Sequence, residues 1–166
     1  MFRLRILSLF FLAFLGGAAQ ALSRDNDLSI TPVRQKTAVW CWLAVGEMVF
    51  EHYGVPDVNP VGIFQCGIVG LVALHGLAPP VCNLDCGQCK HPAGTAERLR
   101  QMLELYPKVL RDNGQYDATI NAGHQQSALS KSRIVSEIDA GNPIVAGISP
   151  GSNLGELPAE AQLTLH

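Results

Sequence analysis

The chain has 166 residues, 48% of them hydrophobic, and a formal net charge of -2. This length and composition favour one globular domain with a substantial buried core. Because the charges nearly balance and no basic stripe runs along the chain, a nucleic-acid partner is not expected.

The N-terminus has the pattern of an export signal. Two arginines precede an apolar run, 6–15, which is too short to span a bilayer, and an A-x-A cleavage pattern follows at 19–21. We therefore predict a signal peptide at 1–21 and a mature domain at 22–166. The mature domain is expected to be secreted or periplasmic, without stable insertion into a membrane.

The hydrophobic pattern predicts four helices and three short strands. Helical spacing of apolar residues and short apolar or alternating runs distinguish the two kinds of element. The predicted helices span 40–53, 61–77, 95–109 and 132–139, and the predicted strands span 28–30, 143–148 and 162–166. Because most of the helices come before the strands, without regular alternation, the order favours an α+β fold.

The helix predicted at 40–53 is the expected core helix of the domain. Gly54 suits its C-terminal cap, and Pro56 prevents its continuation. Glu47 and Glu51 fall on the side opposite its apolar residues. In the helix predicted at 132–139, the apolar side chains are expected to face inward.

The start of the core helix carries the most distinctive local pattern of the chain. Cys41 lies between Trp40 and Trp42, and Gln35 precedes the cysteine by six positions. The N-terminus of a helix stabilises a thiolate through its dipole and its free N–H groups. In acyl transfer, the Cys41 N–H and the Gln35 side-chain amide are candidate donors to the oxyanion. The pattern predicts a nucleophilic cysteine, and the alternative is a buried apolar cysteine or half of a disulfide.

The cysteine count is odd, since five cysteines are present. In an exported protein, this count favours two disulfides and one reactive thiol, with Cys41 as the candidate for the free thiol. The other four, Cys66, Cys82, Cys86 and Cys89, are also spaced closely enough to bind zinc. The export signal favours disulfides, so no metal is predicted. Their connectivity has three possibilities, between which the sequence does not choose.

The segment 35–53 resembles the active-site helix of papain-like cysteine peptidases. The likeness is greatest to the small bacterial secreted branch that includes staphopain-like and effector peptidases. Residues 37–40 replace the Gly and the second Cys of the plant and lysosomal signature, and a looser likeness continues through 64–67 and 134–148. The resemblance implies a papain-like α+β fold, no cofactor, and hydrolysis of peptide bonds in a peptide or protein substrate.

The same resemblance assigns roles to individual residues. Cys41 becomes the nucleophile, Gln35 the oxyanion donor, and Trp40 and Trp42 the flanking residues of the active site. His166 becomes the catalytic base, at close to the roughly 130–150 residues that separate Cys and His in this family. The family's orienting Asn or Asp would follow His166. We therefore expect this chain to be truncated, with an incomplete β part.

Other functions and another base stay open. A non-catalytic, exported binding domain stapled by disulfides is the main alternative. A transferase that uses an amine in place of water would need the same Cys–His chemistry. His124, in a polar loop, is the second candidate base, whereas His52, His75 and His91 are expected to be surface residues.

Overall fold

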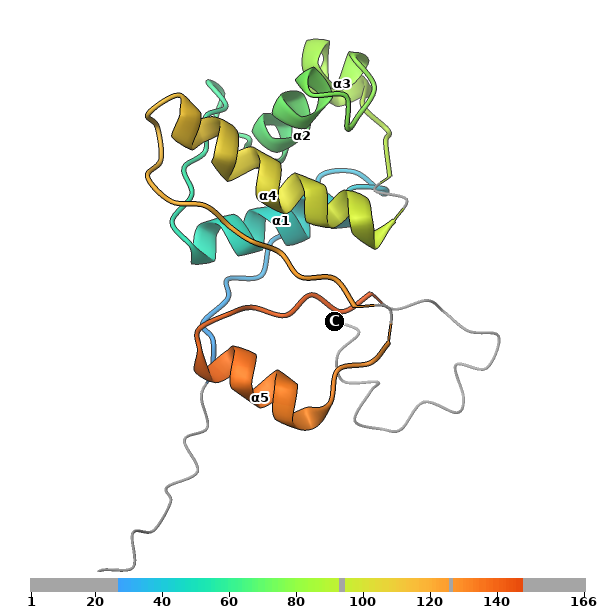
Figure 1. The fold of residues 1–166 in the computed structure, drawn as a ribbon. Helices are drawn as coiled ribbons and strands as arrows, with labels where there is room; N and C mark the ends of the chain where they lie inside the picture. The colour runs from blue at the N-terminus through green and yellow to red at the C-terminus, as the bar shows by residue number, and fades with distance from the viewer. Residues whose placement is uncertain (1–26, 93–94, 126, 148–166) are drawn as a thin grey trace, which may run out of the picture.

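The regular elements of the described chain are all helical. The computed structural model describes residues 27–92, 95–125 and 127–147. Within them, the elements are α1 (Cys41–His52), α2 (Phe64–Leu74), α3 (Val81–Leu84), the 3-10 helix η1 (Cys86–Gln88), α4 (Ala96–Asp112) and α5 (Lys131–Asp139). Helices α1 to α4 lie together, and α5 lies apart from them (Figure 1). The predicted signal peptide, 1–21, lies outside the described residues.

The predicted α+β fold is wrong, because the described residues contain no strand. A strand requires a partner backbone with which it exchanges ladder hydrogen bonds. Residues 28–30 and 143–147 belong to no regular element, and neither segment pairs with another described segment. Ile148 and the predicted strand at 162–166 lie outside the described residues. The segment 143–147 was expected to belong to a buried strand, but none of its residues is buried, and Val145 is 38% exposed.

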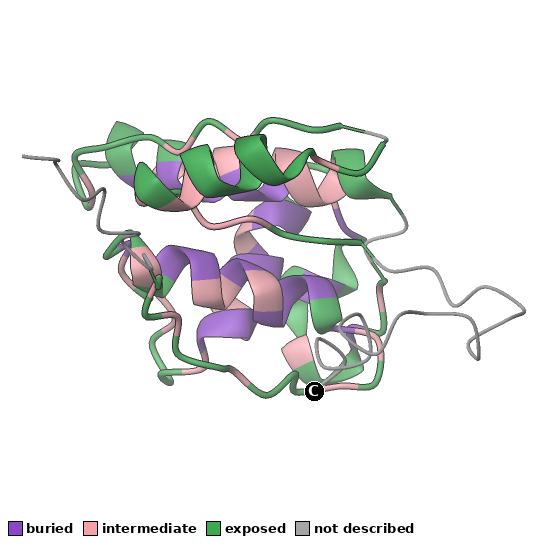
Figure 2. Cartoon of the chain, turned by 90° about the horizontal axis from the view of Figure 1, so that it is seen from below, coloured by how far each residue is buried: buried purple, intermediate pink, exposed green. Residues whose placement is uncertain are grey.

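The core forms where α1, α2 and α4 meet. The Phe50 ring of α1 stacks on the Tyr106 ring of α4 with centroids 4.9 Å apart, and Phe64 of α2 lies 6.1 Å from Phe50. Gly46 permits the close approach of α1 to α4, since an added Cβ would lie 2.6 Å from the Met102 Cε. The buried faces of these helices turn toward one another (Figure 2).

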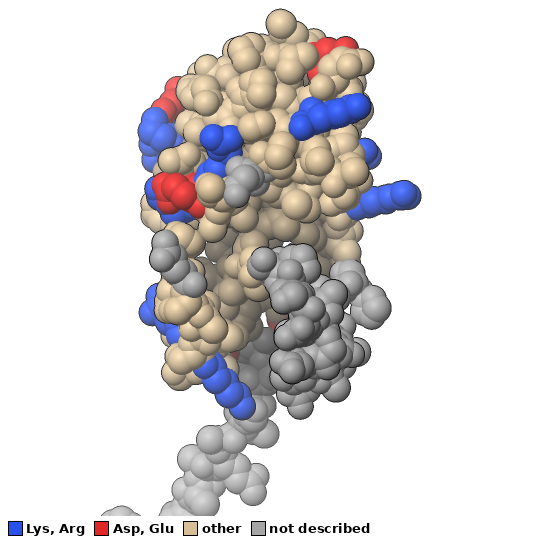
Figure 3. All heavy atoms as spheres, turned by 90° about the vertical axis from the view of Figure 1, so that its right-hand side faces the viewer, with Lys and Arg blue, Asp and Glu red and all other residues tan. Residues whose placement is uncertain are grey.

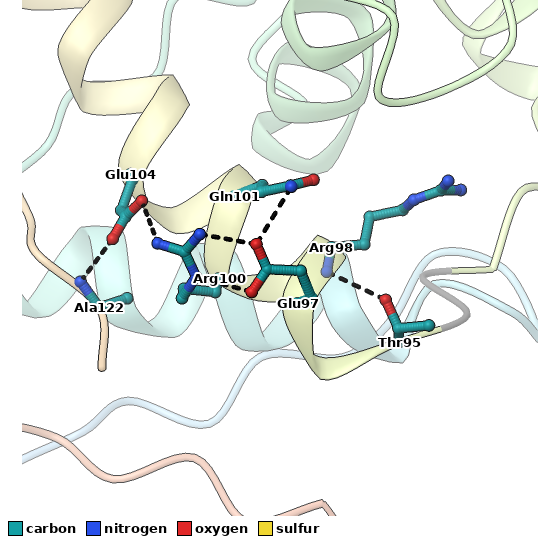
Figure 4. Close-up of polar contacts among 7 residues, drawn as sticks. All are labelled: Thr95, Glu97, Arg98, Arg100, Gln101, Glu104 and Ala122. Atoms are coloured by element: carbon teal, nitrogen blue, oxygen red, sulfur yellow. Dashed lines mark hydrogen bonds and ion pairs between the residues drawn. The ribbon is translucent and has the colours of Figure 1, made fainter. Parts of the chain in front are cut away.

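All four predicted helices are present, and α1 and α5 agree with the predicted 40–53 and 132–139 to within one residue at each end. The prediction of 40–53 corresponds to α1, and Gly54 follows the helix with a φ of 66°. Helix α2 is shorter than the predicted 61–77. Helix α4 is longer than the predicted 95–109, because it continues past Val109 to Asp112. Thr95 caps α4, as its Oγ1 accepts the Arg98 N–H at 3.1 Å (Figure 4).

A charged network runs along α4 and holds the chain that follows it. The Arg100 guanidinium lies between the Glu97 and Glu104 carboxylates, at 2.6 and 2.7 Å (Figure 4). The other oxygen of Glu104 accepts the Ala122 N–H at 3.2 Å. The segment after α4 therefore returns along the same helix.

Helix α5 is packed much less tightly than the prediction required. Ile134 and Val135 were expected to face inward but are 41% and 47% exposed, and no residue of α5 is fully buried. Next to α5, the Gly141 C=O lies 2.9 Å from His52 Nε2 of α1. Since no strand covers the apolar side of α5 within the described residues, these side chains stay accessible.

One face of the molecule carries its charged side chains in small groups. On the face drawn in Figure 3, Lys and Arg side chains are separated by uncharged surface and by acidic side chains. Among the described helices, none has the length and apolar character needed to cross a membrane.

Candidate functional site

Cys41 is the first residue of α1, and its thiol is exposed and unpaired. The Trp40 C=O accepts the N–H groups of Leu43 and Ala44 at 3.0 Å. The N–H groups of Cys41 and Trp42 have no acceptor among the described residues. No acidic residue occupies the first turn, so no carboxylate competes for the positive end of the helix dipole. This local geometry suits an anionic group bound at the helix start.

The two tryptophans fix the helix start in the core. Trp40 is 1% exposed and Trp42 is 2% exposed. The Trp42 indole N–H donates to the His91 C=O at 3.0 Å, whereas the Trp40 indole N–H is buried without a partner in the described part of the chain. The Trp40 N–H also donates to the Thr37 C=O at 3.2 Å, which closes a turn directly before Cys41. Cys41 is therefore presented to solvent by two buried neighbours.

Gln35 lies on an exposed segment whose backbone is hydrogen-bonded to a buried side chain of α2. Its own side chain is exposed and makes no hydrogen bond with a described residue. On either side of it, Gln65 Oε1 accepts the Lys36 N–H at 2.9 Å and Gln65 Nε2 donates to the Arg34 C=O at 3.0 Å. Gln65 is 0% exposed and also donates to Glu47 Oε2 at 2.7 Å. The structure thus links the Gln35 segment to the helix that carries the thiol.

Glu47 is half-buried, which differs from the prediction of a place opposite the apolar side of its helix. Burial raises the pKa of its carboxyl, and the hydrogen bond from Gln65 acts in the opposite direction.

The sequence analysis missed Gln65 as a site residue. The available signal was a single amide side chain within the long apolar stretch 61–77, because buried amides are retained where their hydrogen bonds are satisfied.

Two histidines are engaged in structural contacts. His52 Nε2 lies 2.9 Å from the Gly141 C=O, near the end of α1 remote from Cys41. Arg98 donates to His91 Nε2 at 2.8 Å, which requires that this nitrogen be unprotonated. Burial and then the Arg98 charge lower the pKa of His91. Both rings are more enclosed than the predicted surface positions.

The candidate bases are not brought to Cys41 by the described residues. His75 and His124 are exposed, and no described histidine forms a hydrogen bond with the Cys41 thiol. His166, the base expected from the resemblance, lies outside the described residues.

The four other cysteines form two disulfides, which confirms that prediction and resolves the connectivity. Cys66 is bonded to Cys86, and Cys82 is bonded to Cys89. Cys41 is the free cysteine, as expected from the odd count. The zinc alternative does not apply, since these thiols are consumed, and no group of potential metal ligands occurs in the described ranges. The Cys66–Cys86 disulfide joins α2 to η1 next to Gln65, and the Cys82–Cys89 disulfide joins α3 to the residue that follows η1.

A separate cavity of about 540 Å³ lies between α1 and the segment around α5. Its lining is mainly apolar and includes Val45, Met48, Val49, Ile134, Ile138 and Ile144. Neither Cys41 nor Gln35 lines it, so this cavity is distinct from the thiol site.

The description of the thiol site depends on its residues and geometry, and not on similar proteins. Comparisons with protein-family models, curated proteins and solved structures found no match to this chain. The likeness of segment 35–53 to papain-like peptidases is therefore a matter of local pattern. The structure shows an exposed Cys41 thiol at the start of α1 and an exposed Gln35 amide on a segment whose backbone is hydrogen-bonded to Gln65.

Proposed function

We propose that this protein is an exported cysteine hydrolase that cleaves peptide bonds with papain-like chemistry. The observation that supports this function is Cys41, the free and exposed thiol at the first position of α1. At this position the N–H groups of Cys41 and Trp42 have no acceptor among the described residues and can donate to a negatively charged group. The two disulfides fit an oxidising compartment, in which a free thiol is uncommon without a chemical role.

In the proposed reaction, the Cys41 thiolate attacks the scissile carbonyl carbon and forms a C–S bond. The Cys41 N–H and the Gln35 amide donate to the oxyanion of the tetrahedral intermediate. The imidazolium of His166 then gives its proton to the leaving amine as the C–N bond breaks. Water, deprotonated by the same imidazole, hydrolyses the thioester and restores the thiol–histidine pair.

Alkylation and hydrolysis together test this function. The folded, non-reduced protein is treated with iodoacetamide and the label is mapped, with label expected at Cys41. Hydrolysis of fluorescein-labelled casein is then compared in wild type, Cys41→Ala, His166→Ala and His124→Ala. We expect Cys41→Ala to abolish hydrolysis, His166→Ala to lower it about 10²–10⁴-fold, and His124→Ala to leave it unchanged.

The second candidate is a non-catalytic binding domain stapled by disulfides. It is favoured by the paired cysteines and by the absence of a histidine bonded to Cys41 among the described residues. The same assay separates the two functions. Alkylation at Cys41 combined with equal casein turnover in wild type and Cys41→Ala would support the binding domain.

A further inference from the structure

A buried amide of α2 holds the segment that carries Gln35. Gln65 accepts the Lys36 N–H at 2.9 Å and donates to the Arg34 C=O at 3.0 Å. These bonds flank Gln35 on both sides along the chain. Because the Gln35 side chain is exposed and makes no hydrogen bond with a described residue, its backbone is held while its amide stays available.

The same amide connects this segment to the helix of the nucleophile. Gln65 Nε2 donates to Glu47 Oε2 at 2.7 Å, and Glu47 belongs to α1, which begins at Cys41. Hydrogen bonds to a charged carboxylate are stronger than neutral ones. Gln65 is 0% exposed, so breaking its bonds would leave buried polar groups unpaired. The link between the Gln35 segment and α1 is therefore costly to distort.

The backbone of Gln65 is itself restrained by its two neighbours in α2. Gln65 is the second residue of α2, and the next residue, Cys66, is bonded to Cys86. The preceding residue, Phe64, packs against Phe50 and Tyr106 in the core. Gln65 thus projects from a turn that is fixed by a disulfide on one side and by aromatic packing on the other.

We propose that Gln65 is a positioning residue for the reaction at Cys41, acting through Gln35. This inference rests on the proposed hydrolase function. An oxyanion donor lowers a barrier when it is held in place before charge develops. A displacement of about 1 Å in such a group can cost roughly 10²-fold in rate. By holding both backbone neighbours of Gln35 relative to α1, Gln65 fixes the segment that carries the proposed oxyanion donor.

The test compares Gln65→Met, Gln35→Ala and the double variant in the full chain. Met preserves the length of the side chain and removes all three hydrogen bonds, and Gln88→Met on the exposed surface of η1 is the matched control. Two rates are measured for each protein, hydrolysis of fluorescein-labelled casein and alkylation of Cys41 by iodoacetamide. Alkylation forms no oxyanion, so it reports the thiol without the donor.

We expect Gln65→Met to lower casein turnover about 10–100-fold and to leave the alkylation rate within about twofold of wild type. In the Gln35→Ala background, the Gln65 substitution is expected to cost nothing further, because the residue it positions is gone. Glu47→Gln keeps an acceptor for Gln65 and should retain most of the turnover. If Gln65→Met does not fold, Glu47→Met is used in its place, with a smaller loss that again vanishes in the Gln35→Ala background.

Four results would overturn the inference. Parallel losses of turnover and alkylation would assign Gln65 a purely structural role. Independent, multiplicative losses in Gln35→Ala and Gln65→Met would separate the two residues. Casein turnover that does not depend on Cys41 would remove the proposed function and this inference together, whereas wild-type turnover in Gln65→Met within an active protein would remove the inference alone.

Discussion

Loss of the Cys66–Cys86 disulfide should measurably destabilise the domain. The two cysteines are separated by 20 positions, and the chain-entropy relation for a loop of this length gives about 3.3 kcal/mol of stabilisation. The Cys82–Cys89 disulfide closes a loop of only 7 positions, for which the same relation gives about 2.4 kcal/mol. We expect Cys66→Ala/Cys86→Ala to lower the free energy of unfolding by about 3 kcal/mol.

Urea denaturation followed by tryptophan fluorescence measures this loss. Trp40 and Trp42 are 1% and 2% exposed, so unfolding transfers both indoles to water. Wild type and the double variant are compared without reductant and again with dithiothreitol, which breaks Cys66–Cys86 in wild type and Cys82–Cys89 in both proteins. A gap that persists in reductant would show that packing rather than cross-linking causes the difference. A gap below about 1 kcal/mol without reductant would refute the loop-entropy reasoning.

Two further predictions concern α4 and its neighbour His91. Thr95→Ala removes the cap of α4 and should cost about 1 kcal/mol of unfolding free energy, while Thr95→Ser should cost little, as measured by urea denaturation. Because the folded pKa of His91 lies below the ordinary 6.5, the unfolded chain binds the proton first, and stability should fall as the pH drops below 6.5. His91→Gln should flatten that dependence between pH 7 and 5 in the same assay, and an unchanged slope would contradict it.

The helix that carries Cys41 was predictable because local sequence determines where it ends and which side is buried. Gly54 and Pro56 mark where α1 must end, and the apolar spacing marks its buried side. The odd cysteine count singled out Cys41 without any knowledge of the fold. The pairing of the other cysteines was not predictable, since it depends on how α2 and η1 meet in space.

The strands failed for a related reason. An apolar run such as 143–147 predicts burial, but only a partner backbone converts an extended segment into a strand. Ile134 and Val135 are a similar case. Their helix was predicted correctly, but no described element covers these two side chains, which stay 41% and 47% exposed. Periodicity specifies which side of an element is apolar, and tertiary contacts specify what that side meets.

Gln65 illustrates what lies between these two cases. A lone amide in an apolar helix is unfavourable unless each of its polar atoms finds a partner. Its presence therefore predicts a buried hydrogen-bonded contact, although the sequence does not identify the partners. The structure supplies Arg34, Lys36 and Glu47, which are drawn from the two segments on which the proposed chemistry depends. If hydrolysis depends on Gln35, Gln65 determines how precisely the segment that carries this donor is held.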